Sequence, residues 1–163
     1  MIDAETRALS IRVLEACRAR RWLVATAESC TGGLVAGALT EIAGSSDVVD
    51  RGFVTYSNAA KMALLGVPEA TLAAQGAVSK ATAEAMAQGA LARAGVDLTV
   101  AITGVAGPGG GSAEKPVGLV HFAAAAKDGR LTHREQRYGD IGRSEVRRLS
   151  VIEALDMLLE LAG

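Results

Sequence analysis

The chain has 163 residues, of which 50% are hydrophobic, 21% charged and only 3% aromatic, and its formal net charge at pH 7 is −1. This length fits one domain, 1–163, whose core must be built mainly from alanine, valine, leucine and isoleucine. A nucleic-acid surface needs a basic patch interleaved with aromatic residues, which this composition does not offer, so we expect no nucleic-acid partner.

The sequence indicates neither a membrane span nor a metal site. No apolar run reaches the roughly 18 residues of a membrane span, and the first five residues, MIDAE, do not resemble a secretory signal. Two cysteines, Cys17 and Cys30, give no disulfide framework in a chain of this size. No histidine, cysteine or carboxylate group has the spacing of a metal site. We therefore expect a cytoplasmic protein without cofactor, metal or membrane partner.

Hydrophobic periodicity and turn residues divide the chain into alternating helices and strands. In chain order the predicted elements are a helix over 4–20, a strand over 22–27, a helix over 34–42, a strand over 48–56, helices over 59–65, 69–75 and 80–93, strands over 98–102, 117–126 and 131–138, and a last helix capped by Ser144. This order indicates an α/β layered domain with a mixed sheet. The first and last helices have long aliphatic faces that a small domain has limited room to bury, so we expect a homodimer or larger homo-oligomer.

The turn after the first strand, Thr-Ala-Glu-Ser-Cys-Thr-Gly-Gly at 26–33, is rich in small and hydroxyl side chains. Capping the next helix would need only one of its hydroxyl groups, so we expect the turn to do more. A turn that opens a helix directs free N–H groups at an anion or a developing oxyanion. Ser29 and Cys30 are alternative nucleophiles, because neighbours on a turn point in different directions and only one can face a substrate. The expected binding residues here are Thr31, Gly32 and Gly33.

A serine nucleophile needs a base. The two histidines, His121 and His133, lie in predicted strands away from the turn, so a Ser-His-Asp triad is not expected. Lys61 stands alone in an apolar segment after the strand that ends at Tyr56. Lys61 either reaches solvent or, if kept from water, provides a neutral amine that can accept the serine proton. Tyr56 is either a half-buried aromatic or a group that relays a proton or holds the amine.

A second glycine-rich stretch, 104–112, follows the predicted strand 98–102. Loops after the carboxyl ends of strands in an α/β sheet gather in one crevice, so this loop is expected to face the turn at 26–33. It lacks the Gly-Lys-Ser/Thr of a Walker A loop and the following helix of a dinucleotide fingerprint. It is either a flexible connector or a backbone cradle for a phosphate or carboxylate. Its candidate binding residues are Gly104, Gly107, Gly109, Gly110, Gly111 and Ser112.

Five separated motifs, covering about residues 5–160, resemble the CinA C-terminal domain family. They lie at 26–33, at 52–58 with Lys61, at 76–79, at 103–108 and at 114–118. The family includes stand-alone nicotinamide mononucleotide deamidases. The resemblance therefore implies a three-layer α/β/α sandwich, usually homo-oligomeric, with a small nucleotide as substrate. The implied reaction converts nicotinamide mononucleotide to nicotinate mononucleotide and ammonia, in pyridine nucleotide salvage.

The resemblance also implies roles for single residues. Ser29 corresponds to the nucleophile, Lys61 and Tyr56 to residues that support it, and Thr103 lines the same pocket with the glycine loop. Two departures stand out. Position 59 is alanine where members often have an acidic residue, and 139–143 reads Gly-Asp-Ile-Gly-Arg where many have Gly-Asp-Arg. Arg143, at the start of the last helix, is a candidate phosphate ligand. The alternative is a non-catalytic nucleotide-binding or scaffolding module of the same fold.

Overall fold

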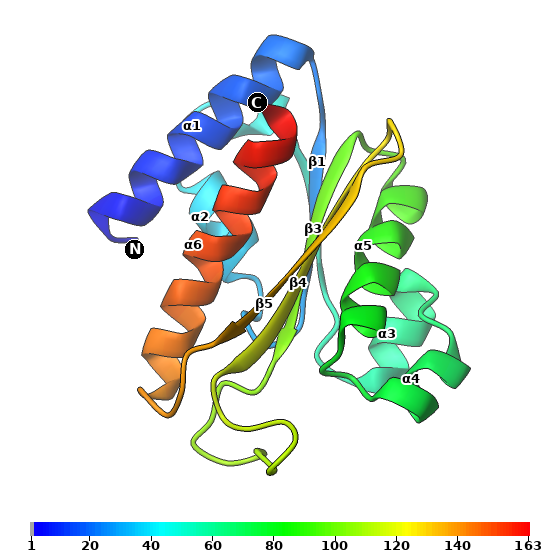
Figure 1. The fold of residues 1–163 in the computed structure, drawn as a ribbon. Coiled ribbons are helices and arrows are strands. Elements are labelled where there is room, and N and C mark those ends of the chain that lie inside the picture. Colours follow the sequence, from blue (N-terminus) through cyan, green and yellow to red (C-terminus); the bar gives the residue numbers. More distant parts are fainter. Residues whose placement is uncertain (1) are drawn as a thin grey trace.

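A mixed five-stranded sheet forms the middle layer of the computed structural model, which describes residues 2–163 (Figure 1). The strands are β1 (Val24–Glu28), β2 (Val49–Val54), β3 (Leu98–Gly104), β4 (Leu119–Ala126) and β5 (Leu131–Arg137), in the spatial order β2-β1-β3-β4-β5. β1 pairs in parallel with both β2 and β3, whereas the β3–β4 and β4–β5 pairs are antiparallel. The predicted mixed sheet is confirmed.

Helices cover both faces of this sheet (Figure 1). One face carries α1 (Ala4–Arg20), α2 (Leu34–Thr40) and α6 (Arg143–Ala162), and the other carries α3 (Asn58–Leu65), α4 (Glu69–Gln75) and α5 (Lys80–Ala94). A short 3-10 helix, Ser45–Asp47, precedes β2. The fold is therefore the three-layer α/β/α sandwich that the resemblance implied. No helix within residues 2–163 combines the length and the apolar character needed to cross a membrane.

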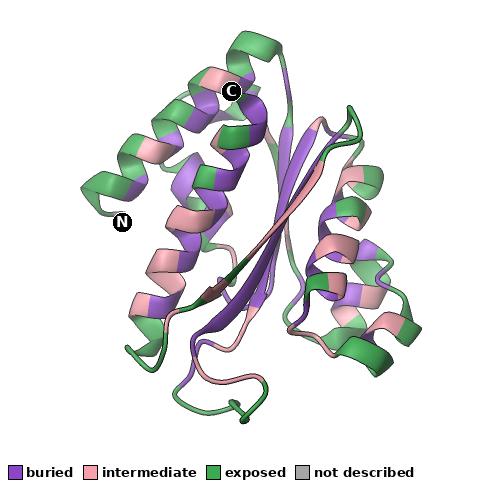
Figure 2. Cartoon of the chain, in the orientation of Figure 1, coloured by how far each residue is buried: buried purple, intermediate pink, exposed green. Residues whose placement is uncertain are grey.

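The central strands are buried on both sides, as their apolar sequences predicted (Figure 2). Along β4, Val120 and Phe122 join the core beneath α1 and α6, whereas Ala123 and Ala125 join the core beneath α5. The small side chains on the α5 face bring that helix close to the sheet, so that the hydroxyl of Thr99 donates a hydrogen bond to a carbonyl of α5 at 2.8 Å.

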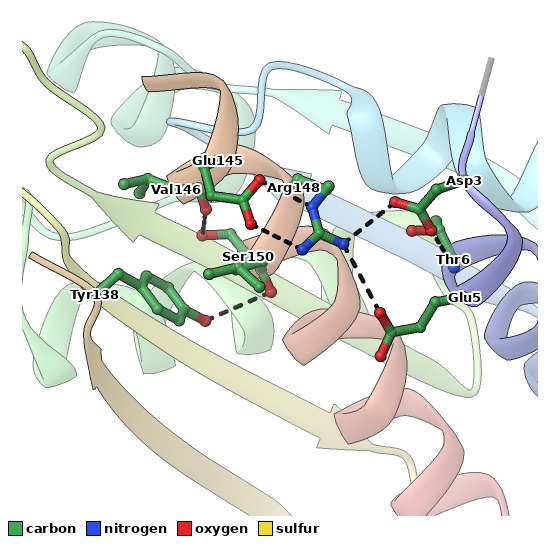
Figure 3. Close-up of polar contacts among 9 residues, drawn as sticks. Asp3, Glu5, Thr6, Tyr138, Glu145, Val146, Arg148 and Ser150 are labelled. Atoms are coloured by element: carbon green, nitrogen blue, oxygen red, sulfur yellow. Dashed lines mark hydrogen bonds and ion pairs between the residues drawn. The ribbon is translucent and has the colours of Figure 1, made fainter. Parts of the chain in front are cut away.

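The first and last helices pack against each other (Figure 1). Their buried residues, such as Val13, Leu14, Leu155 and Leu158, belong to one core cluster. Arg148 on α6 also pairs with the acidic residues at the start of α1 (Figure 3). The aliphatic faces that suggested an oligomer are therefore largely covered within the chain.

The predicted cap of the last helix is wrong. Helix α6 begins at Arg143, and its N-cap is Gly142, which provides no side-chain hydrogen bond to the helix. Gly142 has a φ of +97°, a conformation that a residue with a Cβ rarely adopts. The chain therefore enters α6 through a glycine turn, and Ser144 already lies inside the helix.

Candidate active site

Glu28, the last residue of β1, fixes the turn that carries Ser29. Its fully buried carboxylate accepts hydrogen bonds from the backbone N–H groups of Val35 at 2.9 Å and Ala36 at 3.0 Å, in the first turn of α2. The hydroxyl of Thr26 donates a third, at 3.1 Å. A carboxylate at this position satisfies free N–H groups and interacts favourably with the helix dipole. Glu28 thus caps α2 from the preceding strand, and the hydroxyl of Ser29 is not used for capping.

Ser29 and Lys61 are in direct contact. The Lys61 Nζ lies 2.9 Å from the Ser29 Oγ and 2.7 Å from the carbonyl oxygen of Thr55, to which it donates. The Lys61 residue is only 1% exposed. Burial lowers the pKa of the Lys61 amine, because the charged form loses its hydration. Lys61 is therefore not a solvated surface lysine, and its environment favours the neutral amine.

The local fold explains how a lysine comes to be buried here. Helix α3 follows β2 closely, and the Ser57 hydroxyl caps it by accepting from the Ala60 N–H at 3.0 Å. Further along, α3 packs against α5 at Gly89, where a Cβ would overlap the carbonyl oxygen of Leu65. These contacts hold Lys61, in the first turn of α3, over the end of β1. Ala59 is exposed, so the departure from the family pattern at this position faces solvent.

Cys30, the alternative nucleophile, is in a different electrostatic state. It is 5% exposed, and burial raises the pKa of its thiol to about 12. A thiol with this pKa is almost entirely protonated near neutral pH, whereas the reactive form of cysteine is the thiolate. The contact with Lys61 is made by Ser29. The geometry therefore favours Ser29 as the nucleophile.

One backbone N–H group next to Ser29, that of Cys30, is available to a ligand. The amides of Ser29 and Gly32 are occupied, donating to the carbonyl oxygens of Ile102 and Ser29. In contrast, the amides of Cys30 and Thr31 donate to no other residue within 2–163, but Thr31 is fully buried and only Cys30 lines the cavity beside Ser29. Free amides beside a nucleophile match the arrangement that stabilises an oxyanion.

A cavity of about 270 Å³ opens beside Ser29, between the turn after β1 and the glycine loop after β3. The predicted site residues that line it are Ser29, Tyr56, Gly104, Gly107, Gly109, Gly110 and Arg143. Cys30, Val78, Val105 and Ala106 complete the lining. The two glycine-containing segments thus face each other, as predicted from their positions after the carboxyl ends of two strands. Val78 was not predicted as a site residue.

Arg143 joins two other parts of the cavity lining. Its guanidinium donates to the carbonyl oxygen of Gly107 and to the hydroxyl oxygen of Tyr56, both at 2.8 Å. Tyr56 is 61% exposed, so it is not a half-buried aromatic. The Lys61 amine is held by the Thr55 carbonyl rather than by Tyr56. Tyr56 and Arg143 are therefore joined to each other within the cavity lining, whereas Lys61 contacts Ser29 and does not itself line the cavity.

Other predicted binding residues lie outside the cavity lining. The hydroxyl of Thr103 donates to the carbonyl oxygen of Ala77 at 2.7 Å and is buried. Ser112 accepts from the Lys115 N–H, and a Cβ at Gly111 would meet the backbone of Val117 at 2.8 Å. These residues shape the glycine loop rather than its inner surface. The remaining three, Thr31, Gly32 and Gly33, belong to the turn itself.

The two histidines contact each other and not the turn. The His121 Nδ1 lies 2.9 Å from the His133 Nε2, and their rings stack with centroids 5.2 Å apart. His121 is on β4 and His133 on β5, on the face covered by α5. As predicted, they do not form a triad with Ser29.

Known proteins similar to the chain can now be compared with this site. A sequence model of the CinA C-terminal domain matches residues 6–162. The chain is 52% identical over 160 residues to the nicotinamide-nucleotide amidohydrolase PncC of Enterobacter agglomerans, covering 98% of this chain and 96% of that protein. It is 53% identical over 159 residues to the same-named protein of Escherichia coli strain K12, covering 97% and 95%.

A solved structure agrees with these matches. The crystal structure of the competence/damage inducible protein CihA from Agrobacterium tumefaciens superposes with a TM-score of 0.98 at 56% identity, covering 100% of this chain and 99% of that one. The resemblance predicted from the five sequence motifs is thus confirmed over nearly the whole length. The chain belongs to the CinA C-terminal domain family.

Proposed function

We propose that this chain hydrolyses the carboxamide of nicotinamide mononucleotide to nicotinate mononucleotide and ammonia, with Ser29 as nucleophile and Lys61 as general base. The chain is an amide hydrolase by its relationship to amidohydrolases at 52% and 53% identity. The observation that carries the mechanism is the 2.9 Å contact between the buried Lys61 amine and the Ser29 hydroxyl at the edge of a cavity. The product assigns the reaction to pyridine nucleotide salvage.

The mechanism follows from the positions of these groups. The neutral Lys61 amine accepts the Ser29 proton while Oγ attacks the carboxamide carbon. The amide of Cys30, which lines the cavity, stabilises the oxyanion that forms. The Lys61 ammonium then donates a proton to the departing nitrogen, which leaves as ammonia and gives an acyl-enzyme on Ser29. A water molecule, deprotonated by Lys61, hydrolyses that ester and releases the carboxylate product.

We assign the phosphate of the substrate to the part of the cavity that Arg143 and the glycine loop line. Arg143 provides a guanidinium there, and the amides of Gly109 and Gly110 donate to no other residue within 2–163. Guanidinium groups and free amides are the usual partners of a phosphate. The two departures from the family pattern do not favour a non-catalytic module, because Ala59 is exposed and Arg143 still lines the cavity.

The decisive experiment is an ammonia assay on the purified chain with nicotinamide mononucleotide. We expect turnover by the unmodified chain and loss of several orders of magnitude in Ser29→Ala, because the covalent route is removed. Cys30→Ala should retain measurable turnover. Survival of activity in Ser29→Ala together with its loss in Cys30→Ala would reverse the assignment of the nucleophile. A well-folded chain without any ammonia release would rule out the proposed reaction.

A further inference from the structure

The buried hydroxyl of Thr55 has no hydrogen-bond partner among residues 2–163, and the same holds for the hydroxyls of Ser10 and Thr31. An unpaired hydroxyl in a protein interior is destabilising, so its presence requires an explanation. Thr55 directly follows β2, and its carbonyl oxygen accepts a hydrogen bond from the Lys61 amine at 2.7 Å. The mechanism assigns no role to the Thr55 hydroxyl.

Strand geometry places the Thr55 side chain on the face of the sheet that carries α3. The Thr55 N–H donates to the carbonyl oxygen of Glu28 at 2.9 Å, which continues the β1–β2 ladder by one residue. Along β2, Phe53 packs against the core beneath α5, whereas Val54 lies beside the turn before α2. Successive side chains of a strand alternate between the two faces. Thr55 therefore lies on the same face as Phe53.

The side chain of Ser29 lies on this face as well. The Glu28 carboxylate is turned toward α2, so the next side chain, that of Ser29, is turned toward α3, where the Lys61 amine meets it at 2.9 Å. In the register of β1 and β2, Glu28 is opposite Val54, which makes Ser29 and Thr55 neighbours. Adjacent strands lie about 4.8 Å apart. The hydroxyls of Ser29 and Thr55 are therefore close to each other and to the Lys61 amine.

The number of N–H groups on Lys61 changes during the proposed reaction. The neutral amine has two N–H groups, of which one donates to the Thr55 carbonyl, and a lone pair that accepts the Ser29 proton. The ammonium has three N–H groups, and the Thr55 carbonyl and the Ser29 Oγ accept two of them. Lys61 has no third polar partner within residues 2–163. Because Lys61 is only 1% exposed, its ammonium needs a third acceptor from the protein.

The ionisable groups around Lys61 do not supply this acceptor. The Cys30 thiol, in the turn after β1, acts on Lys61, but its pKa of about 12 keeps it protonated near neutral pH. The Glu28 carboxylate is bonded to the amides of α2, and the Tyr56 hydroxyl accepts from Arg143. Helix α5, which packs against α3, buries no ionisable side chain. The acceptor that remains on this face is the Thr55 hydroxyl.

We propose that the Thr55 hydroxyl accepts the third N–H of the Lys61 ammonium and thereby makes Lys61 a stronger base toward Ser29. This inference rests on the proposed function. Thr55 does not line the cavity, so it is a positioning residue that acts through Lys61. A hydrogen bond to the charged form favours that form, so the hydroxyl partly opposes the effect of burial on the pKa of the amine.

The test compares Thr55→Val with Thr55→Ser. Valine keeps the shape of threonine without the hydroxyl, so we expect the pKa of Lys61 and the midpoint of the pH–rate profile to fall by about one pH unit. The plateau kcat should fall about tenfold, because the base is weaker. KM should stay within about twofold, because Thr55 does not line the cavity. Thr55→Ser keeps the hydroxyl and should restore both the pKa and kcat.

Ser10→Ala is the matched control. Ser10 on α1 has another buried, unpaired hydroxyl, on the opposite side of the sheet from α3 (Figure 1). Both Thr55→Val and Ser10→Ala should keep or raise the midpoint of urea denaturation, since each removes an unpaired polar group. Only Thr55→Val should lower kcat and the pKa of Lys61. If Thr55→Val does not fold, Thr55→Ala, which also lacks the hydroxyl, provides the same readouts.

The pKa of Lys61 is measured without substrate, which separates this inference from the proposed function. Lys61 is one of four lysines, so NMR of the chain labelled with carbon-13 at lysine Cε follows its titration, and Lys61→Arg assigns the signal. A lower pKa in Thr55→Val that Thr55→Ser restores supports the inference, and an absence of ammonia release then refutes the proposed function alone. An unchanged or raised pKa in Thr55→Val, or a pKa that stays low in Thr55→Ser, would overturn the inference.

Discussion

At the scale of single residues, the burial of Lys61 sets the pH range of the proposed reaction. An ordinary lysine has a pKa of about 10.4 and is charged near pH 7, but desolvation lowers the pKa of Lys61. The neutral fraction grows as pH rises, so we expect the rate of ammonia release to rise with pH and level off at an apparent pKa below that of free lysine. Lys61→Arg should lose about a thousandfold, because guanidinium stays charged and cannot accept a proton.

This pH profile is measured from initial rates between pH 5 and pH 10, with the fold checked at each pH by circular dichroism. Lys80→Arg on α5, whose side chain is largely exposed, is a matched control that should leave the profile unchanged. A fully active Lys61→Arg enzyme with an unaltered profile would place the base elsewhere.

Arg143 leads to a prediction about substrate choice. Nicotinamide riboside lacks the phosphate, so losing about 3 kcal/mol of charge-assisted hydrogen bonding should lower kcat/KM by about a hundredfold relative to the mononucleotide. In Arg143→Ala the difference between the two substrates should shrink, since the phosphate is the only part of the substrate that we assign to the guanidinium. Kinetics with both substrates measure this, and Arg137→Ala on β5 provides a control. Equal efficiency of the two substrates in the unmodified chain would show that the phosphate is not bound.

The residues of the site differ in how far the sequence could predict them. Ser29 and Lys61 could be proposed because each is chemically unusual in its own segment. Glu28 lies inside the same motif, but its role as a cap depends on where α2 folds back onto the strand end. Arg147 donates hydrogen bonds to the carbonyl oxygens of Cys30 and Thr31. It is 117 positions from Cys30 in the chain, and only the packing of α6 beside the turn brings the two together.

At the scale of elements, Glu28 joins β1 to α2. Replacing it with glutamine removes the charge on a buried acceptor of three hydrogen bonds, so we expect a loss of about 1–3 kcal/mol in the free energy of unfolding. Urea denaturation measures this change. Glu41→Gln is the matched control, because its pair with Arg7 is exposed and the expected change is below about 0.5 kcal/mol. Equal effects of the two substitutions would contradict the capping role.

The histidine pair makes the β4–β5 hairpin sensitive to acid. Burial lowers the pKa of both His121 and His133. His121 also faces charges from Glu135, Lys115 and Arg137, whereas His133 faces charges from Lys80, Glu84 and Glu135. The pKa of each histidine in the folded state lies below the unfolded value of about 6.5. At pH values near and below 6.5 the unfolded state therefore binds more protons than the folded state. The stabilisation is complete above about pH 6.5 and is lost as pH falls through the lowered pKa values.

The prediction is that the free energy of unfolding decreases between pH 7.5 and pH 5.5 and that His133→Gln shows a smaller decrease. Urea denaturation of both proteins at the two pH values tests this. A pH-independent stability in the unmodified chain, or an identical decrease in His133→Gln, would show that the pair does not titrate in this window.

Element boundaries show where sequence patterns stop being informative. The apolar run at 117–126 predicted a strand, but β4 begins at Leu119, because Gly118 has a φ of +92° and its N–H donates to the carbonyl of Val105. Hydrophobicity cannot locate the start of a ladder when the preceding loop is also apolar. The last helix shows the same limit, since a glycine turn rather than a hydroxyl side chain precedes it.

At the scale of the whole molecule, the sequence predicted the layers but not the full strand order. Alternating elements indicated the mixed sheet, and the rule for strand ends brought the two glycine-containing segments together. The placement of β2 at one edge follows from pairing that no local pattern reveals. That edge carries exposed apolar side chains near the cavity, with Val54 47% and Tyr56 61% exposed, and Leu64 on α3 lies exposed as well.

A homodimer or larger oligomer remains our prediction, with a different interface from the one first expected. Because α1 and α6 bury their aliphatic faces against each other, the sheet edge at β2, where Val54 is exposed, is the better candidate. Light scattering at micromolar concentration should give more than the 16.6 kDa of one chain. Val54→Lys should shift the protein toward the monomer, because a desolvated charge at an interface is costly. Ile11→Lys on α1 should not. A monomeric unmodified chain would refute the prediction, and dissociation by Ile11→Lys alone would place the interface on α1.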